Sequence, residues 1–421
     1  MTIGVYTKNN YSIKCRTTEK INRHTKTQYA LFGLIVACCL GEVINIYGIK
    51  LSWIMALLTI VFFIGEHNSL KIKIPTYDIK LFFYFFIIWG VYATVQTAFI
   101  LKNDYAVSNY ISLLVNLFTI TMLTLNIQSK KDIIFLNKGL VLGLIINLLI
   151  AYWELFTGNH LVLLNERNML YYSDKALGVF GNGNDLATFI CFGIIAVLLQ
   201  YAFTNKNKVP ALIIITASMY IIIRIGARGA LYGMIVYGLC FAFFCILIKL
   251  YSISKASFSI VLYLLCVVCV IIGFIVLSNY TLIDLVLMIS SPGNESSDLF
   301  RLSLMGEALQ LFFNSFFLGI GPGQSIVLLG TNVHNFFLEI MCEYGIIIIS
   351  GILMIFIYLL RAYRWKLPKL LTLCILSFTP AFVLIGVSSS GANRIRTTWI
   401  LITIMYLAIS LYKKESANVL K

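Results

Sequence analysis

The chain has 421 residues, of which 60% are hydrophobic and 12% are charged, and its formal net charge is +15. A soluble globular domain has about 25% charged residues, so this composition excludes a soluble protein and indicates an integral membrane protein. The basic residues are scattered among short loops rather than gathered in one domain, which argues against a nucleic-acid partner and for membrane topology.

Apolar runs of about 20 residues recur along the chain, and runs of this length predict membrane-spanning helices rather than barrel strands. We therefore expect an all-α integral membrane protein with about twelve spans. The expected spans are 29–48, 49–66, 79–100, 107–127, 133–156, 180–203, 209–224, 228–249, 257–280, 335–361, 368–388 and 397–412. The 10 cysteines lie almost all within these runs, where cysteine acts as a small hydrophobic residue, so neither disulfides nor a metal site are expected.

The spans divide the chain into consecutive segments. They are a cytoplasmic N-terminal tail (1–28), spans one to nine (29–280), an extracytoplasmic loop with an amphipathic helix (281–334), spans ten to twelve (335–412) and a cytoplasmic C-terminal tail (413–421). This orientation places most of the 32 basic residues in cytoplasmic segments, as the positive-inside rule requires. Both termini are therefore expected in the cytoplasm.

The basic residues left on the outer side are mostly arginines. They include Arg224, Arg228, Arg301, Arg394 and Arg396. Arginine presents a rigid fork that binds phosphate through two hydrogen bonds, whereas lysine suffices as a topological anchor. The outer face is therefore a predicted phosphate-binding surface. For any single arginine, snorkelling or pairing with an outer acid is an equally good interpretation.

The long outer loop is expected to contain a helix from a cap at Ser297 or Asp298 to about Phe317. Its polar stripe consists of Ser303, Glu307, Gln310 and Asn314. At 100° per residue, Arg301 falls on the opposite, apolar side of this helix. A helix with this pattern is expected to lie along the membrane surface, where Arg301 would meet a protein partner or a lipid head group.

The stretch from Gly319 to Gly345 joins a Gly/Pro turn to an apolar span that begins at His334 and Asn335. Topology places His334 on the outer face, together with Arg228. Guanidinium groups can neutralise a diphosphate leaving group, and an imidazole with a pKa of about 6.5 can accept a proton from an attacking hydroxyl. The alternative for His334 is a helix-start residue bonded to local backbone. The sequence alone leaves both interpretations open.

Four motifs occur in a fixed order in the second half of the chain. They are GVFGNGND at 178–185, GARGA at 226–230, Phe300-Arg301 opening a helix that runs into FLGIGPG at 317–323, and VHNFFLEIMCEYG at 333–345. In this order the sequence resembles the bacterial O-antigen ligase and Wzy-type polysaccharide polymerase family. It departs from that pattern at Ala227, where the family usually has serine, and in lacking a tryptophan in the helix after Arg301.

The resemblance implies a membrane-embedded glycosyltransferase, without metal or other cofactor, at the outer face of the bacterial cytoplasmic (inner) membrane. The implied donor is an undecaprenyl-diphosphate-linked oligosaccharide and the implied acceptor a glycan hydroxyl; membrane lipid and a chain-length regulator are further expected partners. Arg228 and Arg301 would neutralise the diphosphate, and His334 would activate the acceptor.

Four further residues are predicted to contact substrate: Arg224, Asn184, Asn335 and Glu339. Arg224 is expected one helical turn from Arg228. Asn184, with its neighbour Asp185, has a more common alternative role as a helix cap. Glu339 is included because an acid within a membrane span often has a function, although it could instead form a hydrogen bond with a neighbouring span.

Three functions are compatible with these features. A polymerase extends a lipid-linked repeat, whereas a ligase transfers finished glycan to lipid A core, and both need the same arginine and histidine chemistry. We favour a polymerase for O-antigen or capsule because the first halves of repeat-unit polymerases vary widely, and the first five spans of this chain match the family only in general character. A flippase for lipid-linked oligosaccharide is the alternative of another class, but its two halves are usually repeats, and none is found here.

Overall fold

The computed structural model describes residues 24–41, 45–46, 49–66, 76–99, 103–162, 175–251, 296–365, 367–388 and 395–419. Within these ranges the chain is almost entirely helical, apart from two short antiparallel strands, β1 (Asn45–Ile46) and β2 (Ile49–Lys50). The expected ninth span, 257–280, lies outside the described residues, as do most of the N-terminal tail and the first part of the outer loop.

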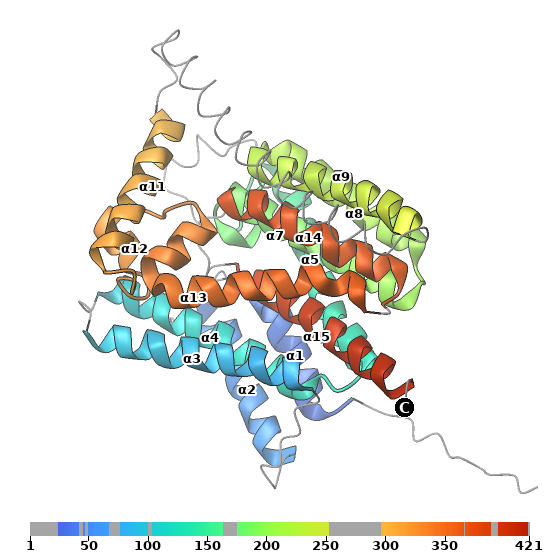
Figure 1. The fold of residues 1–421 in the computed structure, drawn as a ribbon. Helices are drawn as coiled ribbons and strands as arrows, with labels where there is room; N and C mark the ends of the chain where they lie inside the picture. Colours follow the sequence, from blue (N-terminus) through green and yellow to red (C-terminus); the bar gives the residue numbers. More distant parts are fainter. Residues whose placement is uncertain are drawn as a thin grey trace, which may run out of the picture.

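The described helices follow one another as shown in Figure 1. They are α1 (Lys26–Cys39), α2 (Leu51–Glu66), α3 (Tyr77–Phe99), α4 (Asp104–Asn126), α5 (Lys130–Thr157), η1 (Gly178–Phe180), α7 (Gly183–Thr204), α8 (Lys208–Ile225), α9 (Arg228–Tyr251), α11 (Ser296–Asn314), α12 (Gln324–Leu329), α13 (Phe336–Leu360), η2 (Arg361–Arg364), α14 (Lys369–Ser388) and α15 (Arg396–Val419).

In the described part of the chain, eight helices are long and apolar enough to cross a membrane. They are α3, α4, α5, α7, α8, α9, α13 (continued through η2) and α14. Two shorter apolar helices, α1 and α2, overlap the first two expected spans. The expected end of the first span, residue 48, is wrong, because α1 ends at Cys39 and the chain forms β1 at Asn45–Ile46. The protein is therefore an all-α, multi-pass integral membrane protein.

Helix α15 lies inside the bundle. Its residues are buried without interruption from Arg396 to Leu411, and α1, α3, α4, α5, α7 and α13 all pack against it. A helix with no exposed side needs other helices around it, and here they also enclose polar residues such as Arg396 and Thr403. The last helix of the chain therefore organises the core.

The described ends of the chain meet at one end of the bundle, on the side marked C in Figure 1. Gln28 at the start of α1 donates to Asp132 at the start of α5 (3.0 Å), and Lys130 pairs with Glu415 near the end of α15 (2.5 Å). The two ends thus share one side of the bundle. That this side is cytoplasmic stays a prediction from the basic residues.

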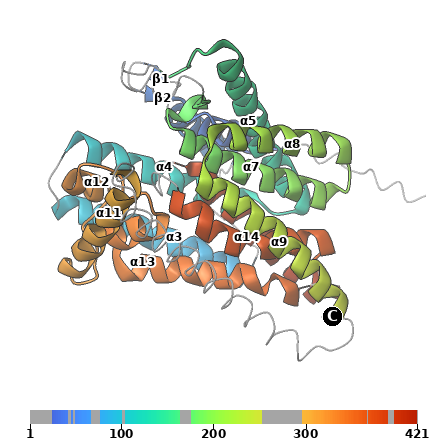
Figure 2. The same ribbon diagram turned by 90° about the horizontal axis from the view of Figure 1, so that it is seen from above.

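The helix expected in the outer loop is present as α11. Its predicted polar stripe is exposed, whereas Leu304, Ala308 and Phe312 are buried. The predicted cap is wrong, because α11 begins at Ser296 and both Ser297 and Asp298 lie inside it. Figure 2 shows α11 and α12 together at one end of the bundle, opposite the end that holds the C-terminus.

Candidate functional site

The first motif forms the turn before α7. The Asn182 side chain caps this helix by accepting a hydrogen bond from the backbone N–H of Asn184 (2.9 Å). The cap role considered for Asn184 and Asp185 is therefore wrong, because Asn182 fills it. The Asn184 side chain is partly exposed and Asp185 is buried. A substrate contact of Asn184 stays a prediction.

The second motif forms the turn between α8 and α9. Helix α8 ends at Ile225, Gly226 follows with a left-handed φ of 72°, and α9 begins at Arg228. Arg224 and Arg228 therefore lie on different helices, and the expected spacing of one helical turn is wrong. Both side chains are exposed. Their role in binding substrate stays a prediction.

Close glycine packing brings these two motifs together. A Cβ on Gly183, the first residue of α7, would lie 2.9 Å from the Ile225 side chain. The backbones of α7 and of the α8–α9 turn approach closely because Gly183 has no side chain. As a result, Asn184 and the two arginines lie at the same end of neighbouring helices.

Helix α14 lies between the arginine turn and the histidine helix. Its residue Ile385 packs against Gly233 of α9, and Gly386 packs against Phe336, the first residue of α13. Arg228 lies one to two turns before Gly233, and His334 lies two residues before Phe336. The C-terminal end of α14 is thus flanked by Arg228 on one side and His334 on the other.

His334 adopts an unusual backbone conformation just before α13. Its φ is 52°, in the left-handed region that a non-glycine residue rarely occupies. The cap of α13 is the next residue, Asn335, whose side-chain oxygen accepts from the N–H groups of Phe337 and Leu338 (both 3.1 Å). Since Asn335 performs the capping, the His334 ring is not needed as the cap, and its side chain is half-buried.

Strained residues of this kind cluster at functional sites, which is consistent with the catalytic role predicted for His334. Asn335 has a structural role as the cap, and its proposed contact with substrate stays a prediction. Glu339 is buried in the first turn of α13, where the helix dipole favours an acid. Its contact with substrate likewise stays a prediction.

Helix α13 is broken at Gly345, which the sequence pattern did not predict. Gly345 has φ 74° and ψ −171°, a conformation that is accessible almost only to glycine. The backbone of the Gly/Pro turn occupies the break: Ile320 N donates to Cys342 O (2.8 Å), Gly321 N to Glu343 O (2.9 Å) and Ile346 N to Phe317 O (2.8 Å). These bonds satisfy the backbone groups that the break releases, as a position at membrane depth requires.

Helix α3 holds the same turn from the other side. The Gln96 side-chain amide lies within hydrogen-bond distance of Leu318 O (3.0 Å), Gly319 O (3.3 Å) and Glu343 O (3.2 Å). The Tyr92 hydroxyl also donates to Leu318 O (2.5 Å). Nothing in the sequence around Gln96 distinguishes it from other polar residues in spans, so sequence reasoning did not predict these hydrogen bonds.

Further buried groups of α11, α12 and α13 pack together near this turn. The Glu343 carboxylate, 1% exposed, accepts from the Ser325 hydroxyl (2.6 Å) at the start of α12. Helix α11 packs on the same part of α13 through Ala308, which forms one buried apolar cluster with Val333 and Cys342. The backbone of Arg301 lies in α11, two turns before Ala308, and its side chain lies outside the described part.

Arg396 does not occupy the exposed position expected from topology. It is 4% exposed, and its guanidinium donates to the hydroxyls of Ser52 in α2 and Ser112 in α4. Arg396 therefore ties three helices together inside the bundle and does not reach an outer glycan. Arg394 lies outside the described residues.

A buried carboxylate near the C-terminal end of α5 was also missed by sequence reasoning. Glu154 accepts from the backbone N–H groups of Leu161 (3.1 Å), Leu177 (2.7 Å) and Gly178 (2.7 Å). His160, whose side chain is also buried, places Nδ1 3.7 Å from the same carboxylate. Glu154 thus anchors the chain on both sides of the connection that leads into α7.

We expect Glu154→Ala to destabilise the protein strongly, because each buried N–H left without an acceptor costs about 1–3 kcal/mol. The matched control is Glu415→Ala, which removes a half-exposed acid paired with Lys130 and should cost less than about 1 kcal/mol. Thermal unfolding of the purified protein in detergent measures both. Equal midpoints for the two variants would contradict the anchoring role of Glu154.

No protein-family profile matches the chain. The sequence is similar to a curated protein, the teichuronic acid biosynthesis protein TuaE of Bacillus subtilis (strain 168). The two are 22% identical over 378 residues, which cover 84% of this chain and 75% of TuaE. The similarity therefore extends well beyond the second-half motifs and includes most of the helical bundle described above.

Proposed function

We propose that this protein is a membrane-embedded glycosyltransferase of cell-envelope polysaccharide synthesis. Its donor is an undecaprenyl-diphosphate-linked oligosaccharide, which it transfers to a glycan hydroxyl at the outer face of the cytoplasmic membrane. The similarity to TuaE supports the general role in polysaccharide biosynthesis. The observation that carries the proposal further is the placement of Arg228 and His334 on either side of the outer end of α14.

The proposed reaction is a displacement at the anomeric carbon of the donor. The acceptor hydroxyl oxygen forms a bond to this carbon while the bond from the carbon to the diphosphate oxygen breaks. The electron pair leaves with the diphosphate, whose charge Arg228 and Arg301 neutralise. The hydroxyl proton passes to His334, acting as a general base. The leaving diphosphate stays attached to its polyprenyl chain in the membrane.

The exposed position of Arg228 suits a ligand that approaches from outside, and the half-buried position of His334 suits a base shielded from bulk water. Arg224, Asn184, Asn335 and Glu339 would bind or orient the sugar and phosphate groups. Transfer to a growing lipid-linked repeat makes the protein a polymerase, and transfer to lipid A core would make it a ligase. We favour the polymerase on the sequence argument given above, since the similarity to TuaE supports polysaccharide biosynthesis in general and does not separate the two.

The test is transfer by purified protein in detergent, with a synthetic undecaprenyl-diphosphate oligosaccharide as the only substrate. A polymerase adds whole repeats stepwise. Reaction only when lipid A core is supplied would instead establish a ligase. Translocation of the glycolipid in liposomes without any transfer would overturn the enzymatic proposal in favour of a flippase.

We expect His334→Ala to reduce the transfer rate about 10²- to 10⁴-fold, the usual contribution of a general base. The control is His24→Ala, which removes an imidazole stacked on Phe135 at the opposite end of the bundle. The control should leave the rate unchanged. Wild-type product from His334→Ala would show that the arginines alone drive the reaction.

A further inference from the structure

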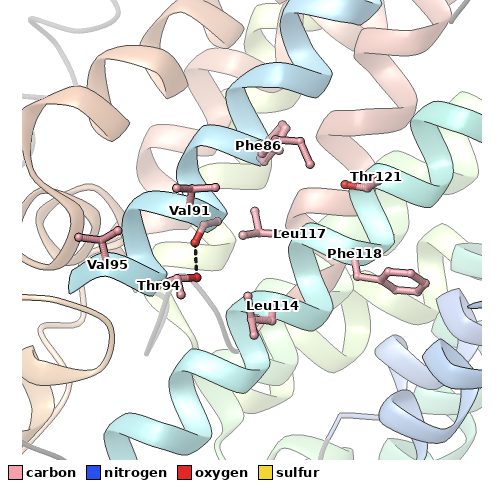
Figure 3. Close-up of a pocket in the computed structure, with 10 residues that line it drawn as sticks. Phe86, Val91, Thr94, Val95, Leu114, Leu117, Phe118 and Thr121 are labelled. Carbon is pink, nitrogen blue, oxygen red and sulfur yellow. Dashed lines mark hydrogen bonds between the residues drawn. The ribbon is translucent and has the colours of Figure 1, made fainter. Parts of the chain in front are cut away.

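An apolar groove runs between α3 and α4, far along the chain from the motifs of the candidate site (Figure 3). It has a volume of about 470 Å³. Its walls are formed mainly by Val91, Val95, Leu114, Leu117 and Phe118. The hydroxyl of Thr94, which also lines the groove, donates to Gly90 O (2.7 Å), so even this polar residue contributes little polarity.

Gly90 leaves part of the groove open. A Cβ at Gly90 would meet only Leu117, at 3.2 Å, so a larger side chain there would extend along the groove. Glycine within a helix costs about 0.5–1 kcal/mol relative to alanine. Gly90 therefore lowers the stability of α3 slightly at the position where a larger side chain would enter the groove.

The groove faces the hydrocarbon of the membrane. Both of its walls are helices long and apolar enough to span a bilayer, and Val91 and Val95 are 59% and 50% exposed. The groove is therefore continuous with the lipid-facing surface of α3. An apolar hollow of this kind does not hold water stably, so its natural occupant is a hydrocarbon chain.

The position of the groove on α3 separates it from the candidate site. Trp89 packs against Tyr344 of α13, and Gln96 bonds to Glu343 O. At 100° per residue these two residues lie roughly 100–160° around α3 from Gly90 and Val91. Because α3 stands between the groove and α13, the groove suits a lipid of the bilayer better than the tail of a donor bound at the site.

A hydrogen bond between hydroxyl groups joins the two helices beside the groove. Thr94 of α3 and Tyr110 of α4 lie 2.7 Å apart across the two helices. Because the Thr94 hydroxyl donates to Gly90 O, Tyr110 is the donor to Thr94. Both hydroxyl protons are thus used within the protein, and the lining of the groove stays apolar.

We propose that this groove binds one acyl chain of a membrane glycerophospholipid. The bound lipid fills the gap between α3 and α4 and so stabilises α3. Since the opposite side of α3 holds the Gly/Pro turn through Tyr92 and Gln96, the lipid also supports the segment that precedes His334. This inference concerns lipid binding and does not depend on the reaction proposed above.

The test compares wild type with Gly90→Leu, whose side chain fills the groove. The matched control is Gly238→Leu, a glycine of α9 that is exposed and has no atom within 4 Å of an added Cβ. Native mass spectrometry during stepwise delipidation measures retained lipid. We expect wild type and Gly238→Leu to keep one phospholipid that Gly90→Leu loses.

Photocrosslinking of the wild-type protein gives a second measurement that does not depend on the folding of a variant. A phospholipid with a diazirine on its acyl chain should label residues 86–95 and 114–121 several-fold more than the exposed surface of α9 around Leu239. Uniform labelling, or equal lipid retention by all three proteins, would overturn the proposal. So would labelling of the groove that only a polyprenyl diphosphate, and not phospholipid, displaces.

Discussion

Arg228→Ala should reduce polysaccharide transfer by about two to three orders of magnitude, the usual loss when one charge-stabilising donor is removed from a reaction centre. The reason is electrostatic. In the proposed reaction, a leaving diphosphate gains negative charge as the bond to the sugar breaks, and Arg228 at the start of α9 would neutralise it. Arg228→Lys should recover part of the rate, because lysine keeps the charge but loses the two-pronged hydrogen bonding.

The assay is the same transfer reaction with purified protein, and insertion into the membrane must be verified for each variant. Arg361→Ala is the matched control, since Arg361 is an exposed arginine that follows α13 at the opposite end of the bundle. It should retain the wild-type rate. Arg301→Ala is expected to behave like Arg228→Ala. A normal product ladder from Arg228→Ala would remove this residue from the proposed mechanism.

Gly345→Ala should destabilise the protein by about 2–5 kcal/mol, from backbone strain together with steric overlap. The φ and ψ of Gly345 are accessible almost only to glycine, and an added Cβ would overlap the backbone carbonyl of Phe317. Gly319→Ala should have a similar effect, because its φ is 83° and its Cβ would lie 2.5 Å from Glu343 O. Thermal unfolding in detergent measures both losses.

A control glycine measures the cost of an ordinary left-handed conformation. Gly330 has φ 73° and ψ −6°, in the region that other residues enter at a modest cost, and no atom lies within 4 Å of an added Cβ. Gly330→Ala should therefore show strain alone, at about 1–2 kcal/mol. If Gly345→Ala and Gly319→Ala were no less stable than Gly330→Ala, the close backbone packing of the turn into the α13 break would be wrong.

The fold class and the positions of most described helices were predictable because each span is a long apolar run. Hydrocarbon forces such a run to form a helix whatever its neighbours, so the signal is local. The exposed polar stripe of α11 followed from helical periodicity in the same way. Its start was misplaced because capping depends on backbone geometry at one or two residues, which composition does not specify.

Sequence reasoning about the site was less complete. The motifs at 178–185, 226–230 and 333–345 drew attention to Arg228 and His334, and residue types suggested their chemistry. That Arg224 lies on a different helix from Arg228 depends on the single left-handed turn at Gly226. The sequence did not reveal the roles of Glu154, Gln96 and Arg396. Each role depends on hydrogen bonds to backbone groups or hydroxyls of other segments, which only the fold brings close.

The sequence by itself determined that this chain is an all-α membrane protein with arginines and a histidine near the ends of its helices. These properties depend on residue type and on neighbours within a few turns. Only the tertiary structure decided that α13 breaks at Gly345, since a lone glycine is compatible with a continuous helix. The helix breaks there because the turn around Gly319 supplies the hydrogen bonds that the break removes, and those partners come from a separate segment of the chain.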